Sequence, residues 1–231
     1  MIQVTDLEKS YNGVKVLGLP TLTIPKGESF GLVGNNGAGK TTFFRLILDL
    51  IKADKGKAEI DGRNAAEHEY WKHFTGSYLD EGFLIDFLTP EEYFDFVASL
   101  YGLSKGDLEA FYARFSDFFN EEIMGKKKYI RDLSKGNQKK VGIAAAMMPR
   151  PSLLLLDEPF TNLDPSSQIR LKNLLRAEQN DKEITMLISS HDLNHVTEVC
   201  NRIVILEKGS LVHDMVTSED TLKILQDYFA V

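Results

Sequence analysis

The sequence predicts an α/β fold, with a mostly parallel sheet, an N-terminal antiparallel β layer and an inserted α-helical subdomain. Three observations predict it. Continuous apolar runs, typical of parallel strands buried on both faces, occur at residues 30–33, 153–156 and 184–190. Alternating apolar residues precede the first run and indicate antiparallel strands. Aromatic residues at helical spacing dominate from about residue 83 to 128.

Length and composition limit the domain organisation and the partners. At 231 residues the chain fits one large domain. We expect a single domain over 1–231, with a core from 1–82 and 150–231 and a helical subdomain over about 83–149. The net charge of −7 argues against nucleic acid as a partner. Cys200 is the single cysteine, which excludes an internal disulfide and favours a reducing compartment.

The N-terminal residues predict two strands and no membrane segment. Ile2, Val4 and Leu7 alternate up to a turn near Tyr11, and a second strand is expected around Leu22 to Ile24. The N-terminus lacks a basic region followed by an apolar core, and no apolar run is long enough to span a bilayer. A membrane role would therefore come through a partner.

A phosphate-binding loop follows the first buried strand. Residues 34–42 have the spacing Gly-x4-Gly-Lys-Thr of a P-loop, between the run 30–33 and a helical run that reaches Leu50. The glycines tolerate positive φ angles that turn N–H groups toward phosphates, and the helix N-terminus adds partial positive charge. The candidate nucleotide-binding residues are Gly34, Asn35, Asn36, Gly37, Ala38, Gly39, Lys40, Thr41 and Thr42.

Two P-loop side chains have specific expected roles. Lys40 would reach the β- and γ-phosphates, and the Thr41 hydroxyl would bind Mg²⁺. The loop predicts a core of the P-loop NTPase class but does not distinguish kinases, GTPases and motor ATPases. Tyr11, just upstream, could stack on an adenine ring or pack on the sheet, and the spacing leaves both open.

The middle of the chain predicts short strands and then helices. Strands are expected at 57–60 and 77–79. Thr89-Pro90-Glu91-Glu92 combines an N-cap, a first-turn proline and a capping-box glutamate. Most aromatic residues of 83–128 should form the core of the helical subdomain, although some could line an exposed docking groove for another protein.

Candidate catalytic groups follow the next two buried strands. Asp157 and Glu158 come directly after four leucines, and His191 follows the run 184–190. The carboxyl ends of parallel strands meet at the edge where ligands bind. Asp157 would hold Mg²⁺, and Glu158 would orient or deprotonate the attacking water, unless the pair only caps the next helix. The candidate catalytic residues are Glu158, His191 and Lys40.

At this point the chain resembles the ATP-binding-cassette ATPases, the nucleotide-binding subunits of membrane transporters, over nearly all its length. Leu133-Ser134-Lys135-Gly136-Asn137-Gln138 is similar to the family signature Leu-Ser-Gly-Gly-Gln at the start of a helix. The resemblance implies that Ser134 and the Gly136 N–H meet the γ-phosphate bound to an opposite subunit. It also implies that Tyr11 stacks on adenine, that His191 contacts the γ-phosphate and that Asp164 communicates across the dimer.

The sequence departs from the family pattern at three positions. Lys135 stands where the family usually has Gly, and Asn137 where it has Gln. Glu81 stands near the position of the family's glutamine between the core and the helical subdomain. A carboxylate there can still bind a metal, so the expected Mg²⁺ ligands are Thr41, Asp157 and Glu81. These features resemble cassettes paired with separate export-type permeases.

The resemblance implies a subunit that binds and hydrolyses ATP with Mg²⁺ and drives transport through a separate integral membrane permease. Two copies, or this chain and a homologous ATPase, would close on ATP as a homodimer or heterodimer, at the cytoplasmic face of the membrane. The alternatives are a soluble cassette ATPase acting on ribosomes or DNA, a small metabolite kinase, and a clamp that hydrolyses ATP too slowly to matter. The sequence does not decide the transported substrate.

Overall fold

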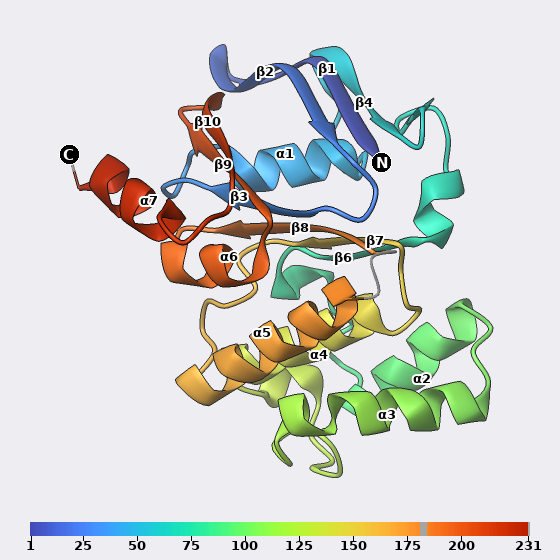
Figure 1. The fold of residues 1–231 in the computed structure, drawn as a ribbon. Coiled ribbons are helices and arrows are strands. Elements are labelled where there is room, and N and C mark those ends of the chain that lie inside the picture. Colours follow the sequence, from blue (N-terminus) through green and yellow to red (C-terminus); the bar gives the residue numbers. More distant parts are fainter. Residues whose placement is uncertain (181–183, 231) are drawn as a thin grey trace.

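The computed structural model describes residues 1–180 and 184–230 and contains two β-sheets with helices around them (Figure 1). The smaller sheet is antiparallel and has the strand order β2-β1-β4-β5. Its strands are β1 (Ile2–Tyr11), β2 (Val14–Ile24), β4 (Lys55–Ile60) and β5 (Arg63–Asn64). The predicted antiparallel layer is confirmed. The second strand starts at Val14 instead of near Leu22, because a two-residue turn at Asn12-Gly13 with positive φ at both positions leads directly back along β1.

The larger sheet is mostly parallel and has the order β10-β9-β3-β8-β7-β6. Its strands are β3 (Ser29–Val33), β6 (Thr75–Tyr78), β7 (Leu153–Leu156), β8 (Thr185–Ser190), β9 (Arg202–Glu207) and β10 (Ser210–Val216). Only the pair β9–β10 is antiparallel in this sheet of the described chain. Every residue of β3, β7 and β8 is buried, as the continuous apolar runs predict.

Helices cover both faces of the larger sheet (Figure 1). Helix α1 (Lys40–Ile47) lies between the two sheets, and its buried Phe43, Phe44 and Ile47 share one core cluster with β1 and β3. The sequence predicts a helix that reaches Leu50, but α1 ends at Ile47. Asp49 has φ 49°, which a helix does not allow. On the other face lie α4 (Lys135–Met147), α5 (Pro165–Asn180) and α6 (Leu193–Val199), and α7 (Thr221–Phe229) ends the described chain.

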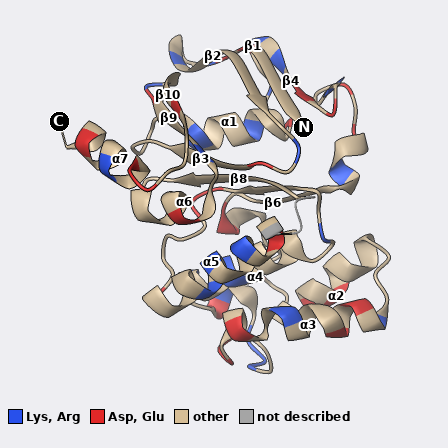
Figure 2. Ribbon diagram, viewed as in Figure 1, with Lys and Arg blue, Asp and Glu red and all other residues tan. Residues whose placement is uncertain are grey.

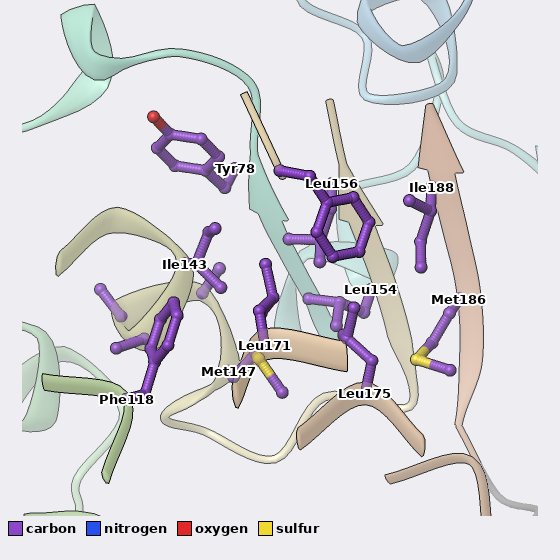
Figure 3. Packing of buried hydrophobic residues seen from close by; sticks show 14 of the residues in the cluster. Tyr78, Phe118, Ile143, Met147, Leu154, Leu156, Leu171, Leu175, Met186 and Ile188 are labelled. Atoms are coloured by element: carbon purple, nitrogen blue, oxygen red, sulfur yellow. The ribbon is translucent and has the colours of Figure 1, made fainter. Parts of the chain in front are cut away.

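The second core cluster joins the larger sheet to these helices. Figure 3 shows side chains of β7 and β8 facing side chains of α4 and α5, with the labelled residues Ile143, Met147, Leu154, Leu156, Leu171, Leu175, Met186 and Ile188. Figure 2 shows basic and acidic residues interspersed over the helices, while the central strands of this sheet are mostly uncharged. The strand interiors are therefore mostly apolar, and the polar side chains of the site come from the residues at the carboxyl ends of the parallel strands.

The helices inserted between β6 and β7 are α2 (Pro90–Leu100), α3 (Lys105–Phe119) and α4. The predicted capping box is confirmed, since the Thr89 hydroxyl accepts from the Glu92 N–H and the Glu92 carboxylate accepts from the Thr89 N–H. Most aromatic residues of α2 and α3 pack in one cluster, which includes Phe94, Phe111, Phe115, Phe118 and Phe119. The exact division into core and helical subdomain stays a prediction.

Helix α4 packs very closely on β6. A Cβ at Gly76 would overlap the Ala146 carbonyl oxygen, and a Cβ at Gly142 would overlap the Tyr78 ring. Both positions therefore need glycine for this helix to reach the strand. The backbone of α4 therefore lies directly against the backbone of β6 at Gly76.

Cys200 ends α6 and is buried, with its Sγ 3.2 Å from where a Cβ at Gly31 would lie. Burial raises the pKa of its thiol well above the usual range. A role as a buried apolar residue fits this position. Within the described residues, no helix combines the length and apolar character needed to cross a membrane.

Candidate nucleotide and catalytic site

The P-loop lies between the end of β3 and the N-terminus of α1 and borders a cavity of about 290 Å³. Gly37 and Gly39 have φ angles of 83° and 108°, which favour glycine. Gly34 does not have a positive φ, contrary to the expectation for all three glycines. Glycine is required there because a Cβ would overlap the Leu206 carbonyl oxygen of β9. The cavity is lined by Val16, Asn36, Gly37, Ala38, Gly39, Lys40, Thr41, Thr42 and Glu158.

Lys40 is 6% exposed, and its ammonium is held inside the loop. Its Nζ donates to the carbonyl oxygen of Gly34 at 2.6 Å and to that of Asn35 at 3.4 Å. The same Nζ lies 3.2 Å from Glu158 Oε1. A buried ammonium needs such partners, because an unpaired charge away from water is strongly unfavourable. The positive charge is thus aimed at the cavity where phosphates would be bound.

Thr41 and Asp157, both predicted metal ligands, contact each other directly. The Thr41 hydroxyl donates to one oxygen of the Asp157 carboxylate, and the Ser189 hydroxyl donates to the other. Burial raises the pKa of Asp157, and the two hydroxyl donors oppose that rise. A hydroxyl and one carboxylate beside a phosphate site are the hard oxygen ligands that suit Mg²⁺, which usually keeps several waters. The residues present therefore fit this ion.

Glu81, the third predicted metal ligand, is engaged elsewhere. It begins a 3₁₀ turn, Glu81–Phe83, and its Oε1 accepts from the Tyr78 hydroxyl at 2.9 Å. Burial is the main cause that raises the pKa of Tyr78, and the bond to Glu81 adds to it. In the described structure Thr41 contacts Asp157, whereas Glu81 is bonded to Tyr78 of β6, the neighbour of β7. A place for Glu81 on the metal stays a prediction.

Glu158 brings the three predicted catalytic residues together. Its Oε1 faces Lys40, and its Oε2 lies 2.8 Å from His191 Nδ1. The residue has φ 47°, and its N–H donates to the Ser189 hydroxyl at 2.9 Å. One carboxylate at the rim of the cavity therefore bridges the P-loop cation and the imidazole that follows β8.

The residues similar to the family signature lie outside this cavity. The Ser134 hydroxyl accepts from the Asn137 N–H at 3.2 Å and caps α4. A Cβ at Gly136 would lie 2.6 Å from the Asn162 carbonyl oxygen, so glycine allows α4 to contact the loop before α5. Neither Ser134 nor Gly136 lines the P-loop cavity of the same chain.

Tyr11 ends β1 with 45% of its surface exposed. The Lys9 ammonium lies 5.4 Å from the centre of its ring. The ring is therefore only partly covered by its own chain, and Tyr11 is not among the residues that line the P-loop cavity. Its role with adenine stays a prediction.

Asp164, predicted to act across a dimer, caps α5 in its own chain. Its carboxylate accepts from the Ser166 hydroxyl at 2.6 Å, and from the N–H and hydroxyl of Ser167. These donors hold the pKa of Asp164 well below its usual range. The capping role accounts for the aspartate at this position, and communication with a second subunit remains a prediction.

Replacing Asp164 with Ala is expected to lower the free energy of unfolding by about 1 kcal/mol at pH 7, because α5 loses its cap. The folded-state pKa is lowered, so this stabilisation is complete above the unfolded pKa of about 4 and decreases as the pH falls below it. Urea unfolding at pH 7 and pH 3 should show the difference between the two proteins shrinking. The exposed Asp117→Ala is the control, with a change within about 0.5 kcal/mol. An equal change for both variants at pH 7 would contradict the capping role.

Two polar residues of the site were not predicted. Ser189 holds both Asp157 and the Glu158 N–H, and its place near the end of an apolar strand was the available signal. Lys139 of α4 is buried, and its Nζ donates to the Glu158 carbonyl oxygen at 2.8 Å. No local pattern marks Lys139, because its partners lie far along the chain.

The comparisons with known proteins identify the family of this chain. The family model described as "ABC transporter" matches residues 18–161. The ABC transporter ATP-binding protein YtrB of Bacillus subtilis (strain 168) is 35% identical over 221 residues, which cover 93% of this chain and 72% of YtrB. A solved structure described as the ATP binding subunit of an ABC transporter has a TM-score of 0.81 at 28% identity, covering 100% of this chain and 93% of that one. A dimeric post-hydrolysis state of the ATP-binding cassette MJ0796, bound to ADP and Pi, has a TM-score of 0.81 at 22% identity, covering 94% and 99%. The chain therefore belongs to the ABC transporter family and is one of its ATP-binding proteins.

Proposed function

We propose that this chain hydrolyses ATP and thereby drives transport through a permease that is a separate polypeptide. The observation that carries the proposal is the Glu158 carboxylate, which bridges Lys40 and His191 at the rim of the P-loop cavity. A carboxylate in that place can act on a water beside a bound γ-phosphate.

The mechanism assigns each side chain one task. The P-loop N–H groups and the Lys40 ammonium bind the triphosphate, and Tyr11 stacks on adenine. Mg²⁺, held by Thr41 and Asp157, would neutralise charge on the phosphate oxygens. Glu158 accepts a hydrogen bond from the attacking water and orients or deprotonates it. His191 lies against Glu158 and supplies a donor toward the γ-phosphate.

The position of the signature residues supports a dimer. Ser134 caps α4 away from the P-loop cavity of its own chain, so its free side is available to the nucleotide of another subunit. A helix N-terminus suits an anion. In the proposed dimer, two subunits close head to tail on ATP, and hydrolysis removes the phosphate that joins them. The similar cassette MJ0796 was solved as a dimer, which supports this arrangement.

A groove between the core and the inserted helices is the proposed docking site of the permease. The groove has a volume of about 490 Å³ and is lined on one side by Leu50 and Trp71 and on the other by Phe96, Leu100 and Tyr101. Leu100 is 66% exposed, and Phe83 at the groove is 55% exposed. Exposed large apolar residues gathered at a groove are typical of a protein-binding site. Docking there would place the chain at the cytoplasmic face of the membrane.

The test is nucleotide-dependent association of the Glu158→Gln variant, which should bind ATP without turnover. With saturating ATP and Mg²⁺, size-exclusion chromatography with light scattering is expected to show a dimer, and a monomer without ATP. The matched control adds Ser134→Arg, which places a bulky side chain on the signature loop. That double variant should bind ATP and remain a monomer. A Glu158→Gln protein that stays monomeric in ATP would overturn the composite site.

Steady-state hydrolysis measured with the purified permease separates the transport ATPase from a slow clamp. A transport ATPase should be stimulated by the permease, whereas a clamp would turn over equally slowly with and without it.

A further inference from the structure

Lys139 is a buried cation whose contacts are not to a carboxylate within the described structure. It lies in the second turn of α4 and is 4% exposed. Its Nζ donates to the Glu158 carbonyl oxygen at 2.8 Å and to the Thr161 hydroxyl at 2.6 Å. The Tyr78 ring centre lies 5.7 Å from the same Nζ. Burying an ammonium is unfavourable, so neutral partners of this kind indicate a specific task for the side chain.

The group that Lys139 holds is the backbone of Glu158. This residue has φ 47°, a left-handed conformation that is strained for a residue with a Cβ. The Ser189 hydroxyl accepts from its N–H, and its carbonyl oxygen accepts from Lys139 and from the Thr161 hydroxyl at 2.8 Å. Both ends of the residue are therefore fixed. The direction of the Glu158 side chain follows from this backbone geometry.

Burial and the neighbouring carboxylates act on the pKa of Lys139 in opposite directions. Burial lowers its pKa, and the carboxylates of Glu81, Glu158 and Asp157 oppose that fall. Glu81 accepts a hydrogen bond from the Tyr78 hydroxyl, and the Tyr78 ring lies beside the Lys139 ammonium. The cation of α4 thus lies among three carboxylates of the site without a direct bond to any of their oxygens in the described chain.

We propose that Lys139 is a positioning residue, which holds the Glu158 peptide so that its carboxylate meets Lys40 and His191. The inference rests on the proposed role of Glu158 in hydrolysis. Lys139 acts through the backbone and touches no reacting atom. Ser134 caps the same helix about 7.5 Å away along its axis. In the proposed dimer, α4 therefore has two tasks. Its N-terminus seals the nucleotide bound to the other subunit, and its Lys139 positions the carboxylate that serves the nucleotide of its own subunit.

Lys139→Met keeps a side chain of similar length but removes the N–H donors, and Lys139→Arg keeps both the N–H donors and the positive charge. We expect Lys139→Met to lower kcat about tenfold to a hundredfold, as misplacement of a catalytic group does. The Kd of a fluorescent ATP analogue should stay within about twofold, since Lys139 does not line the P-loop cavity. Lys139→Arg should restore most of the lost kcat. A purely structural role would not divide kcat from binding in this way.

The matched control is Lys140→Met. Lys140 is the next residue of α4, is 1% exposed and pairs with Glu122 at 2.9 Å instead of with Glu158. The Lys140→Met variant should have a kcat within about twofold of the wild-type value. Equal losses in the two methionine variants, or a wild-type kcat in Lys139→Met, would overturn the proposal.

Hydrogen exchange tests the positioning without hydrolysis. In Lys139→Met, the amides of residues 158 and 160–163 should exchange at least about tenfold faster than in the wild type, whereas Lys140→Met should leave them unchanged. Failure of ATP turnover in the wild type would reject the proposed function, but unchanged exchange in Lys139→Met would reject this inference. If Lys139→Met does not fold, Thr161→Val removes the bridging hydroxyl. It should speed exchange at the same amides, and wild-type exchange there would overturn the proposal.

Discussion

Replacing Glu158 with Gln is expected to lower the turnover of ATP by at least about a hundredfold, the range found for loss of a positioned general base. The amide is nearly the same size as the carboxylate but cannot accept a proton from water. The variant also loses a negative charge 3.2 Å from Lys40, which should leave ATP binding equal or tighter. Steady-state phosphate release and equilibrium binding of ATP measure the two effects separately.

The control for this prediction is Glu69→Gln, which neutralises an exposed glutamate paired with Lys72 outside the site. Its turnover should match the wild type. Retention of full turnover in Glu158→Gln, with ATP still bound, would show that another group activates the water. Loss of ATP binding in that variant would instead mean that the carboxylate supports the fold of the P-loop.

Replacing Lys40 with Met is expected to weaken ATP binding by at least about a hundredfold. A charge-assisted hydrogen bond contributes about 1.5–3 kcal/mol, and Lys40 would make such bonds to two phosphates, so the loss corresponds to this factor or more. Its Nζ is buried and held by loop carbonyls, so little reorganisation is needed when phosphates bind. Isothermal titration with ATP and Mg²⁺ measures the change.

Lys57→Met serves as the control, because Lys57 is exposed on β4 and pairs with Glu59. Its ATP affinity should equal that of the wild type. Thermal unfolding of Lys40→Met without nucleotide should show a folded protein. Equal ATP affinities for Lys40→Met and the wild type would contradict the assignment of the P-loop as the phosphate site.

The strands and the P-loop could be predicted because their signals are local. Strands buried on both faces, such as β7 and β8, read as continuous apolar runs, and the P-loop spacing is defined within nine residues. The same criterion applies to the run 203–206, so β9 could also have been predicted. The order of strands in the sheet could not, because pairing such as that of β6 with β7 depends on contacts between distant segments.

Part of the site could also be predicted from local signals. Because parallel strands end at one edge, Asp157, Glu158 and His191 could be placed near the P-loop from their positions after β7 and β8. The engagement of Glu81 by Tyr78 and the contact of Lys139 with Glu158 could not be predicted. The Lys139 contact joins α4 to the loop after β7, and the glycines at 76 and 142 allow α4 to lie this close to the sheet.

The buried Cys200 has a practical consequence for observing closure. It is the one cysteine of the sequence, and it lies inside the protein with a raised pKa, so thiol reagents should react with it slowly. A single cysteine introduced on the surface would then be the preferred site for a fluorophore or spin label, with the native residue left in place. Distances between labels on two subunits could follow opening and closing in the otherwise unmodified chain.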